Sequence, residues 1–254
     1  MSIYIFDTEQ TDRKEGEIVE AAWLRLAPDA DLIGDSDRIP PDLRVEELFC
    51  QRYKPIKQTT FGALAVHHIL PAELEDCPPS SSFALPPDTT YLVGHSIDYD
   101  WQAAGASATV KRICTHALAQ HIWPDADGYS QVALIYMLLG PSESTREQVK
   151  GAHGATADVF LNRILLQHIL QLKPEITTWS ALWEYSEECR IPIYCPLKRW
   201  EGLKLEEMDD GAVDWCRRQG WIDPYFRKGL DRVMEKRYPR AKAMTVDEDD
   251  GIPY

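Results

Sequence analysis

Residues 3–9 read Ile-Tyr-Ile-Phe-Asp-Thr-Glu, a short apolar run that ends in two carboxylates. Four consecutive apolar residues followed by polar ones predict a buried strand. Because side chains alternate along a strand, Asp7 and Glu9 point to the same face, at a separation of roughly 6–7 Å along the backbone. Carboxylates at this separation suit shared divalent cations. A strand end that merely becomes polar gives the same short pattern, so these residues need support from elsewhere in the chain.

The segments that follow predict an α/β fold. Further strands are expected at 17–26, 48–53, 91–94 and 112–114. Helices are expected within 61–75, from near residue 99, and at 115–122, 130–139 and 155–171. Three strands in succession, followed by strands that alternate with helices, predict a mixed five-stranded sheet flanked by helices. In the last of these helices, a face that includes Phe160, Leu161 and Ile164 is expected to be buried.

A second polar cluster follows the strand expected at 91–94, in the sequence Gly-His-Ser-Ile-Asp-Tyr-Asp. Ligands of α/β proteins gather at the carboxyl ends of strands, which makes this turn a candidate site. Asp98 suits a helix cap, and Asp100 would then lie on the first helical turn, facing the cleft. The residues leave open which of the two faces the cleft, and the spacing from His95 favours Asp100.

A third cluster reads Gly-Ala-His-Gly-Ala-Thr-Ala-Asp over residues 151–158. Glycines on either side of His153 indicate a loop that approaches another group closely. A histidine on such a loop, beside a carboxylate at Asp158, is well placed to accept a proton from water. The alternative is a loop histidine without a role and an aspartate that is favoured by the helix dipole.

In chain order the three clusters are D-x-E, H-x-x-x-x-D and H-x-x-x-x-D. The segments IFDTEQTD, VGHSIDYD and GAHGATAD resemble the three motifs of the DEDDh family of 3′→5′ exonucleases. Within that family, residues 1–172 look most like exodeoxyribonuclease X and its relatives. The chain departs from the family pattern at Gln10-Thr11-Asp12, where Thr-x-Gly is usual, at Ser96, where Asn is usual, and at Tyr99, where Phe is usual.

The resemblance implies a ribonuclease H-like fold and hydrolysis assisted by two Mg²⁺ or Mn²⁺ ions. By this resemblance, Asp7 bridges both ions, Glu9 and Asp158 hold one, and Asp100 holds the other largely through water. His153 accepts the proton of the attacking water, and the product is a nucleoside 5′-monophosphate. The substrate contacts implied by the family motifs are Thr8, Gln10, His67 and Ser96.

The chain has 254 residues and a net charge of −14, which argues against tight, non-specific binding of duplexes. A cleft that takes the single-stranded 3′ end of a nucleic acid remains compatible with that charge. Six cysteines without a C-x-x-C pair indicate reduced thiols, and we expect a cytoplasmic protein. No secretory signal and no membrane-spanning run is expected from the sequence.

Composition shifts near Lys173 and Pro174, so we expect a nuclease domain at 1–172 and a small helical module at 173–246. An acidic tail is expected at 247–254. The module's Pro196–Gly202 segment resembles in part the module that follows exodeoxyribonuclease X-like nucleases. A basic helix at 224–238 suits either single-strand binding or a solvated surface, and the solvated surface is favoured slightly.

These observations favour a 3′→5′ exonuclease acting on single-stranded DNA. The same chemistry on RNA or short oligonucleotides is the first alternative. A catalytically idle fold that serves as a protein-binding module is the second, and the presence of all four carboxylates and His153 counts against it. Oligomeric state is left open, with a homodimer as one alternative.

Overall fold

The computed structural model describes residues 2–27 and 42–239, and the chain folds into two compact units, Met1–Arg190 and Ile191–Tyr254. The acidic tail expected at 247–254 lies outside the described residues. Among the described helices, none has the length and apolar character needed to cross a membrane.

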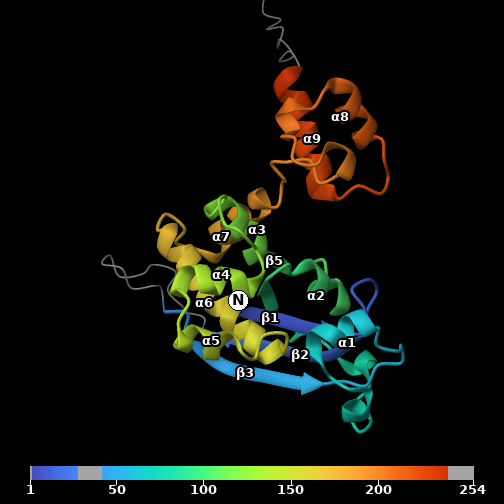
Figure 1. Ribbon diagram of the computed structural model, residues 1–254, viewed down its shortest axis with the longest axis vertical. Helices are drawn as coiled ribbons and strands as arrows, with labels where there is room; N and C mark the ends of the chain where they lie inside the picture. The colour runs from blue at the N-terminus through green and yellow to red at the C-terminus, as the bar shows by residue number, and fades with distance from the viewer. Residues whose placement is uncertain (1, 28–41, 240–254) are drawn as a thin grey trace, which may run out of the picture. The chain divides into compact units, whose positions relative to one another are not determined.

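The first unit is built on a five-stranded sheet with helices beside it (Figure 1). The strand order is β3-β2-β1-β4-β5. The β1–β2 and β2–β3 pairs are antiparallel, whereas β1–β4 and β4–β5 are parallel, so the expected mixed sheet is confirmed. The strands are β1 (Ser2–Gln10), β2 (Ile18–Leu26), β3 (Val45–Arg52), β4 (Thr89–Gly94) and β5 (Lys111–Cys114).

The helices of the first unit agree with the expected segments, with additions. They are α1 (Phe61–His67), η1 (Pro71–Leu74), η2 (Ser80–Ser82), α2 (Asp98–Ala103), α3 (Thr115–Ile122), α4 (Gln131–Leu139), α5 (Glu143–Val149), α6 (Ala155–Leu172) and α7 (Trp179–Cys189), where η marks a 3-10 turn. Helix α5 was not expected, although Ser142 caps it by accepting a hydrogen bond from the Thr145 N–H at 3.1 Å.

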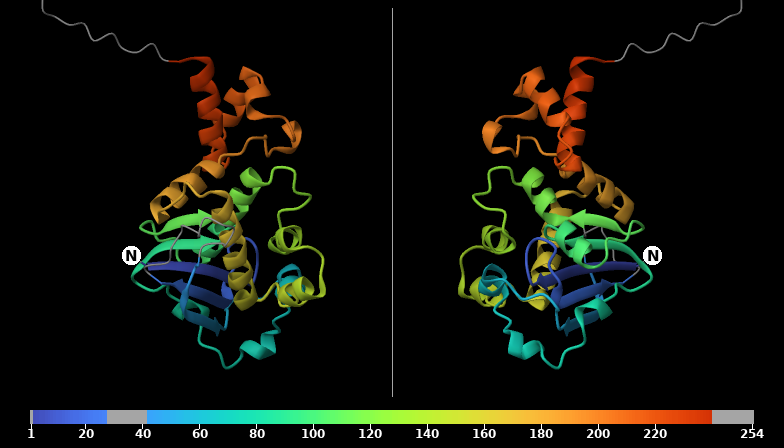
Figure 2. Two further views of the ribbon diagram at one scale, coloured as in Figure 1. Left: turned by 90° about the vertical axis from the view of Figure 1, so that its left-hand side faces the viewer. Right: turned by 90° about the vertical axis from the view of Figure 1, so that its right-hand side faces the viewer.

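Helix α6 packs across β1 and β2 and also contacts α3, α4 and α5 (Figure 2). The face expected to be buried was wrong in part, because Phe160 is 41% exposed while Val159 and Leu166 are fully buried. A helix packed against a sheet on one side and helices on another buries a wider stripe than one amphipathic face. The side of α6 that carries Asp158 therefore turns toward the end of β1.

Helix α7 belongs to the first unit, so this unit extends to Arg190 and not to the boundary expected at 172. Trp179 and Leu182 are buried in the same core as the sheet. The Ser186 hydroxyl accepts a hydrogen bond from the Cys114 N–H at 2.8 Å, which ties α7 to the end of β5. Aromatic and charged residues after Lys173 are thus part of the first unit up to Arg190.

The second unit has its own small core. Its elements are η3 (Lys198–Trp200), η4 (Leu205–Glu207), α8 (Asp210–Arg217) and α9 (Pro224–Arg237). Val213, Phe226 and Leu230 are its most deeply buried large side chains, together with Cys216. This separate cluster confirms the expected mostly helical character of the C-terminal module, although the module begins at Ile191.

Candidate active site

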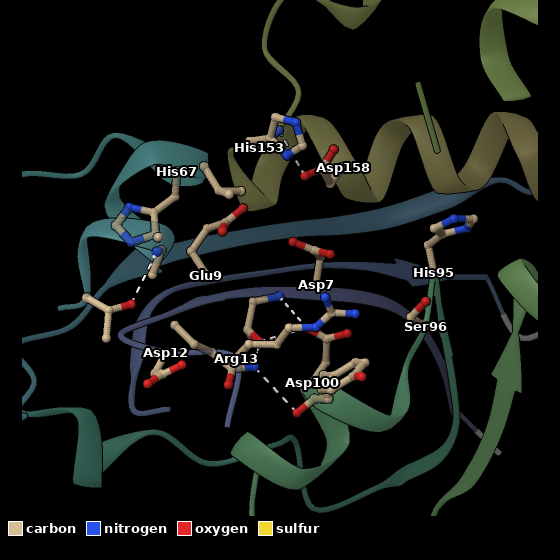
Figure 3. A pocket seen from close by; sticks show the side chains of 17 residues that line it. Asp7, Glu9, Asp12, Arg13, His67, His95, Ser96, Asp100, His153 and Asp158 are labelled. Carbon is tan, nitrogen blue, oxygen red and sulfur yellow. Dashed lines mark hydrogen bonds between the residues drawn. The ribbon is translucent and has the colours of Figure 1, made fainter. Parts of the chain in front are cut away.

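A cavity of about 530 Å³ opens at the carboxyl ends of β1 and β4 (Figure 3). It is the location expected for ligands in α/β proteins. All nine residues singled out from the sequence line this cavity: Asp7, Thr8, Glu9, Gln10, His67, Ser96, Asp100, His153 and Asp158. Segments separated by more than a hundred residues in the sequence therefore meet in one place.

Three carboxylates form the centre of the site. Asp7 and Glu9 point from the same face of β1, and Asp158 lies on the first turn of α6. One oxygen from each of these carboxylates lies within 4.8 Å of the other two. An all-oxygen donor set of this size fits Mg²⁺ or Mn²⁺, which prefer carboxylate and water ligands.

Asp100 lies in the same cavity, and Asp98 does not. The Asp100 carboxylate is 6% exposed and accepts hydrogen bonds from the Thr8 N–H at 2.9 Å and the Thr8 hydroxyl at 2.7 Å. Asp98 instead forms ion pairs with Arg112 and with Arg190, the latter at 2.9 Å. Asp98 therefore anchors the start of α2, while Asp100 faces the cleft.

Thr8 and Gln10 line the cavity, but their side-chain donors are engaged by the protein. The Thr8 hydroxyl donates to Asp100, and the Gln10 side-chain amide donates to the Thr8 Oγ1 at 3.0 Å. The same amide lies 3.4 Å from the carbonyl of Tyr99. This chain of hydrogen bonds orients the Asp100 carboxylate. Thr8 and Gln10 therefore help to position Asp100, in addition to any contact with substrate.

His153 is exposed on the loop that precedes α6, with its ring at the cavity. Its φ of 69° lies in the left-handed region, which side chains other than glycine rarely adopt. The His153 backbone N–H donates to the Asp158 carboxylate at 3.1 Å. This turn brings the imidazole to the carboxylate cluster, and such strained positions are common at functional sites.

His67 offers a hydrogen-bond donor to the cavity. Its Nδ1 accepts the Ile69 N–H at 2.9 Å, which places the imidazole proton on Nε2. Burial lowers the His67 pKa, so the ring is neutral at pH 7. Its Nε2 is buried and has no hydrogen-bond partner among the described residues. A buried donor of this kind is suited to an acceptor oxygen of a bound ligand.

His95 and Ser96 occupy the turn after β4. The His95 ring contacts the Thr115 hydroxyl at 3.2 Å and the Tyr129 carbonyl at 2.8 Å, and burial lowers its pKa to about 4. His95 is therefore a neutral side chain that is held in place by these two contacts. Ser96 has a φ of 66°, in the left-handed region where asparagine is several-fold enriched. Backbone geometry thus explains why asparagine suits this position.

The carboxylates of the cleft repel one another when no cation is present. Burial raises the Asp7 pKa well above its ordinary value, and the charges of Asp100, Asp158, Glu9 and Glu20 raise it further. Burial is also the largest cause that raises the pKa of Glu9 to about 8, of Asp100 to about 7 and of Asp158 to about 6. Such a cluster stores electrostatic repulsion that divalent cations relieve.

Stabilisation by metal is therefore expected to grow as pH rises. A carboxyl whose pKa is raised by folding destabilises the native state increasingly as pH rises through its folded value. For Asp158, Asp100 and Glu9 this loss of stability begins near their ordinary pKa values of 3.8, 3.8 and 4.5 and is complete once the pH exceeds their folded pKa values of about 6, about 7 and about 8. Melting temperature, measured with Mg²⁺, Mn²⁺ or EDTA at pH 5.5, 7 and 8.5, should show the largest metal-induced increase at pH 8.5. A shift of equal size at all three pH values would contradict this account.

Glu20 on β2 is a buried carboxylate that was not singled out from the sequence. It lies opposite Glu9 across the β1–β2 ladder, and one of its oxygens accepts the Ala155 N–H at 3.0 Å. Gly154, the N-cap of α6, has no side chain to accept that hydrogen bond. Glu20 therefore caps α6 from a distant strand. A charged residue inside the apolar run at 18–22 was the available signal, because buried carboxylates need partners.

Arg52 extends this interaction to the other wall of the cleft. It donates to Glu20 at 3.0 Å and to Glu73 at 2.7 Å. Glu73 in turn accepts the Leu70 N–H at 2.8 Å, in the segment that follows His67. The network links the start of α6 to the segment beside His67 through side chains of β2 and β3.

Replacing Glu20 with Ala is expected to lower both stability and turnover. Because the Arg52 side chain is 41% exposed, the loss of its ion pair with Glu20 costs at most about 1 kcal/mol, whereas the buried Ala155 N–H left without an acceptor costs roughly 1–3 kcal/mol. A displacement of about 1 Å in a catalytic group can lower the rate ~10²-fold. Glu20→Gln retains a carbonyl oxygen for the Ala155 N–H and should keep most activity. Glu73→Ala, at the exposed end of the network, is the control. Wild-type kcat in Glu20→Ala would show that the cap does not position the site.

A mixed sheet with a carboxylate cleft at the carboxyl ends of β1 and β4 defines a ribonuclease H-like α/β fold. Neither a protein-family model nor a curated protein matches the sequence. Exonuclease X in complex with 5′-overhanging duplex DNA is similar in structure, with a TM-score of 0.52 and 19% identity over 72% of this chain and 99% of that chain. The first unit thus has the fold of the DnaQ-like 3′→5′ exonucleases.

Two further solved structures align less well. The zinc-bound E. coli ExoI–ssDNA complex has a TM-score of 0.48 and 16% identity, over 72% of this chain and 42% of that chain. Cell-death related nuclease 4 (CRN-4) has a TM-score of 0.47 and 12% identity, over 66% of this chain and 63% of that chain. Since a shared fold does not fix activity, function depends on the cleft itself.

Proposed function

We infer that this chain is a metal-dependent 3′→5′ exonuclease that releases nucleoside 5′-monophosphates from single-stranded DNA ends. The main observation in support is that carboxylate oxygens of Asp7, Glu9 and Asp158 lie within 4.8 Å of one another. His153 lies beside them, on the loop that precedes α6. An idle fold gains nothing from buried carboxylates that repel one another. The similarity in fold to exonuclease X, solved with a 5′-overhanging duplex DNA, supports a substrate with a DNA end.

Asp7, Glu9 and Asp158 would hold Mg²⁺ or Mn²⁺, with Asp100 completing the set from the opposite side of the cleft. Bound cations would supply acidification of the attacking water and neutralisation of the developing negative charge. His153 accepts the proton of that water as its oxygen attacks the terminal phosphorus. The bond from phosphorus to the 3′ oxygen of the penultimate nucleotide breaks, so the phosphate stays on the released nucleotide.

Two other side chains are suited to hold the substrate. The neutral His67 ring offers its buried Nε2–H to an oxygen of the terminal nucleotide. Within the described part of the chain, Arg13 is the one Lys or Arg side chain that lines the cavity, and its guanidinium lies 5.4 Å from the ring centroid of Tyr99. A cation stacked on an aromatic ring at the mouth of the cavity is suited to a phosphate of the incoming strand.

Digestion of end-labelled oligonucleotides tests this function. Single-stranded DNA and RNA with label at the 5′ or the 3′ end are incubated with Mg²⁺, Mn²⁺ or EDTA. A 5′-labelled ladder that shortens one nucleotide at a time, absent in EDTA, is the expected result. Faster digestion of RNA than of DNA would favour the alternative function, that of an exoribonuclease or oligonucleotidase. Absence of hydrolysis by folded, metal-loaded protein would overturn the proposal in favour of an idle fold.

A further inference from the structure

Three tryptophans lie together at the surface of the second unit. The ring centroids of Trp200 and Trp215 are 5.6 Å apart, and those of Trp215 and Trp221 are 6.4 Å apart. Trp215 is 42% exposed and Trp221 is 64% exposed. Tryptophan is highly buried on average, so neighbouring rings with this exposure mark a surface that contacts another molecule.

The fold of the second unit does not require these rings to be exposed. Helix α8 turns Ala212, Val213 and Cys216 into the core, and Trp215 projects from a different face of the helix. Trp200 packs in part against that core, whereas Trp221 lies in the turn between α8 and α9. The outer two rings are thus available to a ligand.

Cationic side chains flank the tryptophans. The Arg199 guanidinium lies 4.7 Å from the centroid of the Trp200 ring, and Arg218 is one helical turn from Trp215. Lys198 precedes Arg199 in the same 3-10 turn. Neither Lys198, Arg199 nor Arg218 forms an ion pair with a carboxylate within residues 2–27 and 42–239.

The basic residues of α9 are used differently. Arg227 donates to the carbonyl oxygens of Arg217 and Gln219, while Lys236 and Arg237 pair with Glu206 and Asp210. These contacts hold the module together, which favours the structural interpretation of the basic helix expected at 224–238. Beside the tryptophans, Lys198 and Arg199 pair with no carboxylate among the described residues, and Arg218 donates its Nε–H to the Asp214 carbonyl at 3.1 Å.

The charge of this module also differs from that of the nuclease unit. Residues 191–239 carry 10 Lys/Arg and 9 Asp/Glu, a net charge of +1, whereas residues 1–190 carry 15 and 28, a net charge of −13. An anionic polymer meets far less repulsion on the second unit. Exposed aromatic rings with flanking cations bind single strands by stacking on bases and by attraction to phosphates.

We propose that Trp200, Trp215 and Trp221, with Lys198, Arg199 and Arg218, form a binding surface for single-stranded nucleic acid. This surface lies on the second unit, and its choice of ligand rests on the proposed exonuclease function. Stacking on an aromatic face accepts any base, which suits an enzyme that shortens strands irrespective of sequence. The surface raises affinity for long strands and leaves the cleavage step unchanged.

Binding by the full-length chain tests the surface separately from hydrolysis. Anisotropy of a fluorescein-labelled 20-nucleotide single strand is measured in EDTA, where no cleavage occurs. Each exposed ring removed is expected to weaken binding ~10-fold, from the usual stacking contribution per base. The variants are Trp215→Ala, Trp221→Ala and Trp221→Phe, the last of which keeps a stacking face. Ile56→Ala, at an exposed apolar residue of the nuclease unit, is the control.

The same variants are then assayed with Mg²⁺ on a trinucleotide and on the 20-nucleotide strand. Loss of affinity and of kcat/KM on the long strand alone, with rescue by Trp221→Phe, supports the surface. Binding that depends on the rings without any hydrolysis would retain the surface and overturn the exonuclease function. If folded Trp215→Ala and Trp221→Ala proteins bind the strand with wild-type affinity, the proposed nucleic-acid surface is wrong. The exposed rings would then be assigned to contact with a protein. Failure of the wild-type protein to bind the 20-nucleotide strand in EDTA would also contradict the proposed surface.

Discussion

Replacing Asp7 with Asn is expected to abolish hydrolysis while raising the stability of the metal-free protein. Asp7 belongs to the carboxylate cluster, and its loss removes one of the three carboxylates that would hold the metal. Metal catalysis supplies several kcal/mol of transition-state stabilisation, so turnover should fall by about 10³-fold or more. In the folded protein the Asp7 pKa is raised well above its ordinary value. At pH 8 Asp7 is ionised in the unfolded chain, and folding must either bury that charge or add a proton, so the carboxyl destabilises the native state and an amide removes that cost.

A lower rate together with a higher melting temperature distinguishes this explanation from simple misfolding. Initial rates with Mg²⁺ and melting temperature in EDTA at pH 8 are compared between wild type and Asp7→Asn. Asp12→Asn is the matched control, because Asp12 lines the same cavity but lies outside the carboxylate cluster. It should retain near wild-type rate and stability. A lower melting temperature of Asp7→Asn in EDTA would contradict the assignment of Asp7 to a repulsive metal cluster.

Replacing His153 with Asn is expected to lower kcat by roughly 10²–10⁴-fold, the usual contribution of a general base. Asparagine is the informative substitution, because it tolerates the left-handed backbone of this residue better than most side chains. The backbone N–H that supports Asp158 is retained in this variant. Metal-induced stabilisation should therefore match that of the wild type, and KM should change little.

The pH dependence of the residual activity separates a proton acceptor from a loop residue. In His153→Asn the residual rate should rise with hydroxide concentration, because hydroxide then takes the place of the protein's proton acceptor. His153→Gly, which also permits the left-handed backbone, should behave in the same way. Full activity of His153→Asn would remove His153 from the mechanism.

The fold and the location of the cleft were predictable because their signals are local. Alternation along β1 fixes the direction of Asp7 and Glu9, and each of the other two clusters spans a helix start that can be read within eight residues. The burial that makes these carboxylates reactive is a property of the packed sheet. It follows from α6 lying across β1 and β2, which no short segment encodes.

Interactions between distant residues were not predictable. Thr8 orients Asp100 across 92 residues, and Glu20 caps α6 across 135 residues. Thr8 and Gln10 were expected to contact substrate, and the structure adds that they donate hydrogen bonds to Asp100 and to Thr8. A single sequence shows that such side chains are polar, and only the tertiary structure shows which partner each one finds.

The ion pair between Arg190 and Asp98 has a consequence for where the chain can be divided. Arg190 is the last residue of the first unit, and its guanidinium anchors the start of the helix that carries Asp100. A chain shortened to residue 172 would lose this anchor together with Trp179 and Leu182, exposing the sheet core. Exchange of the module after Arg190 would leave the core of the first unit and this anchor intact, whereas recombination between 172 and 190 would divide one folded unit.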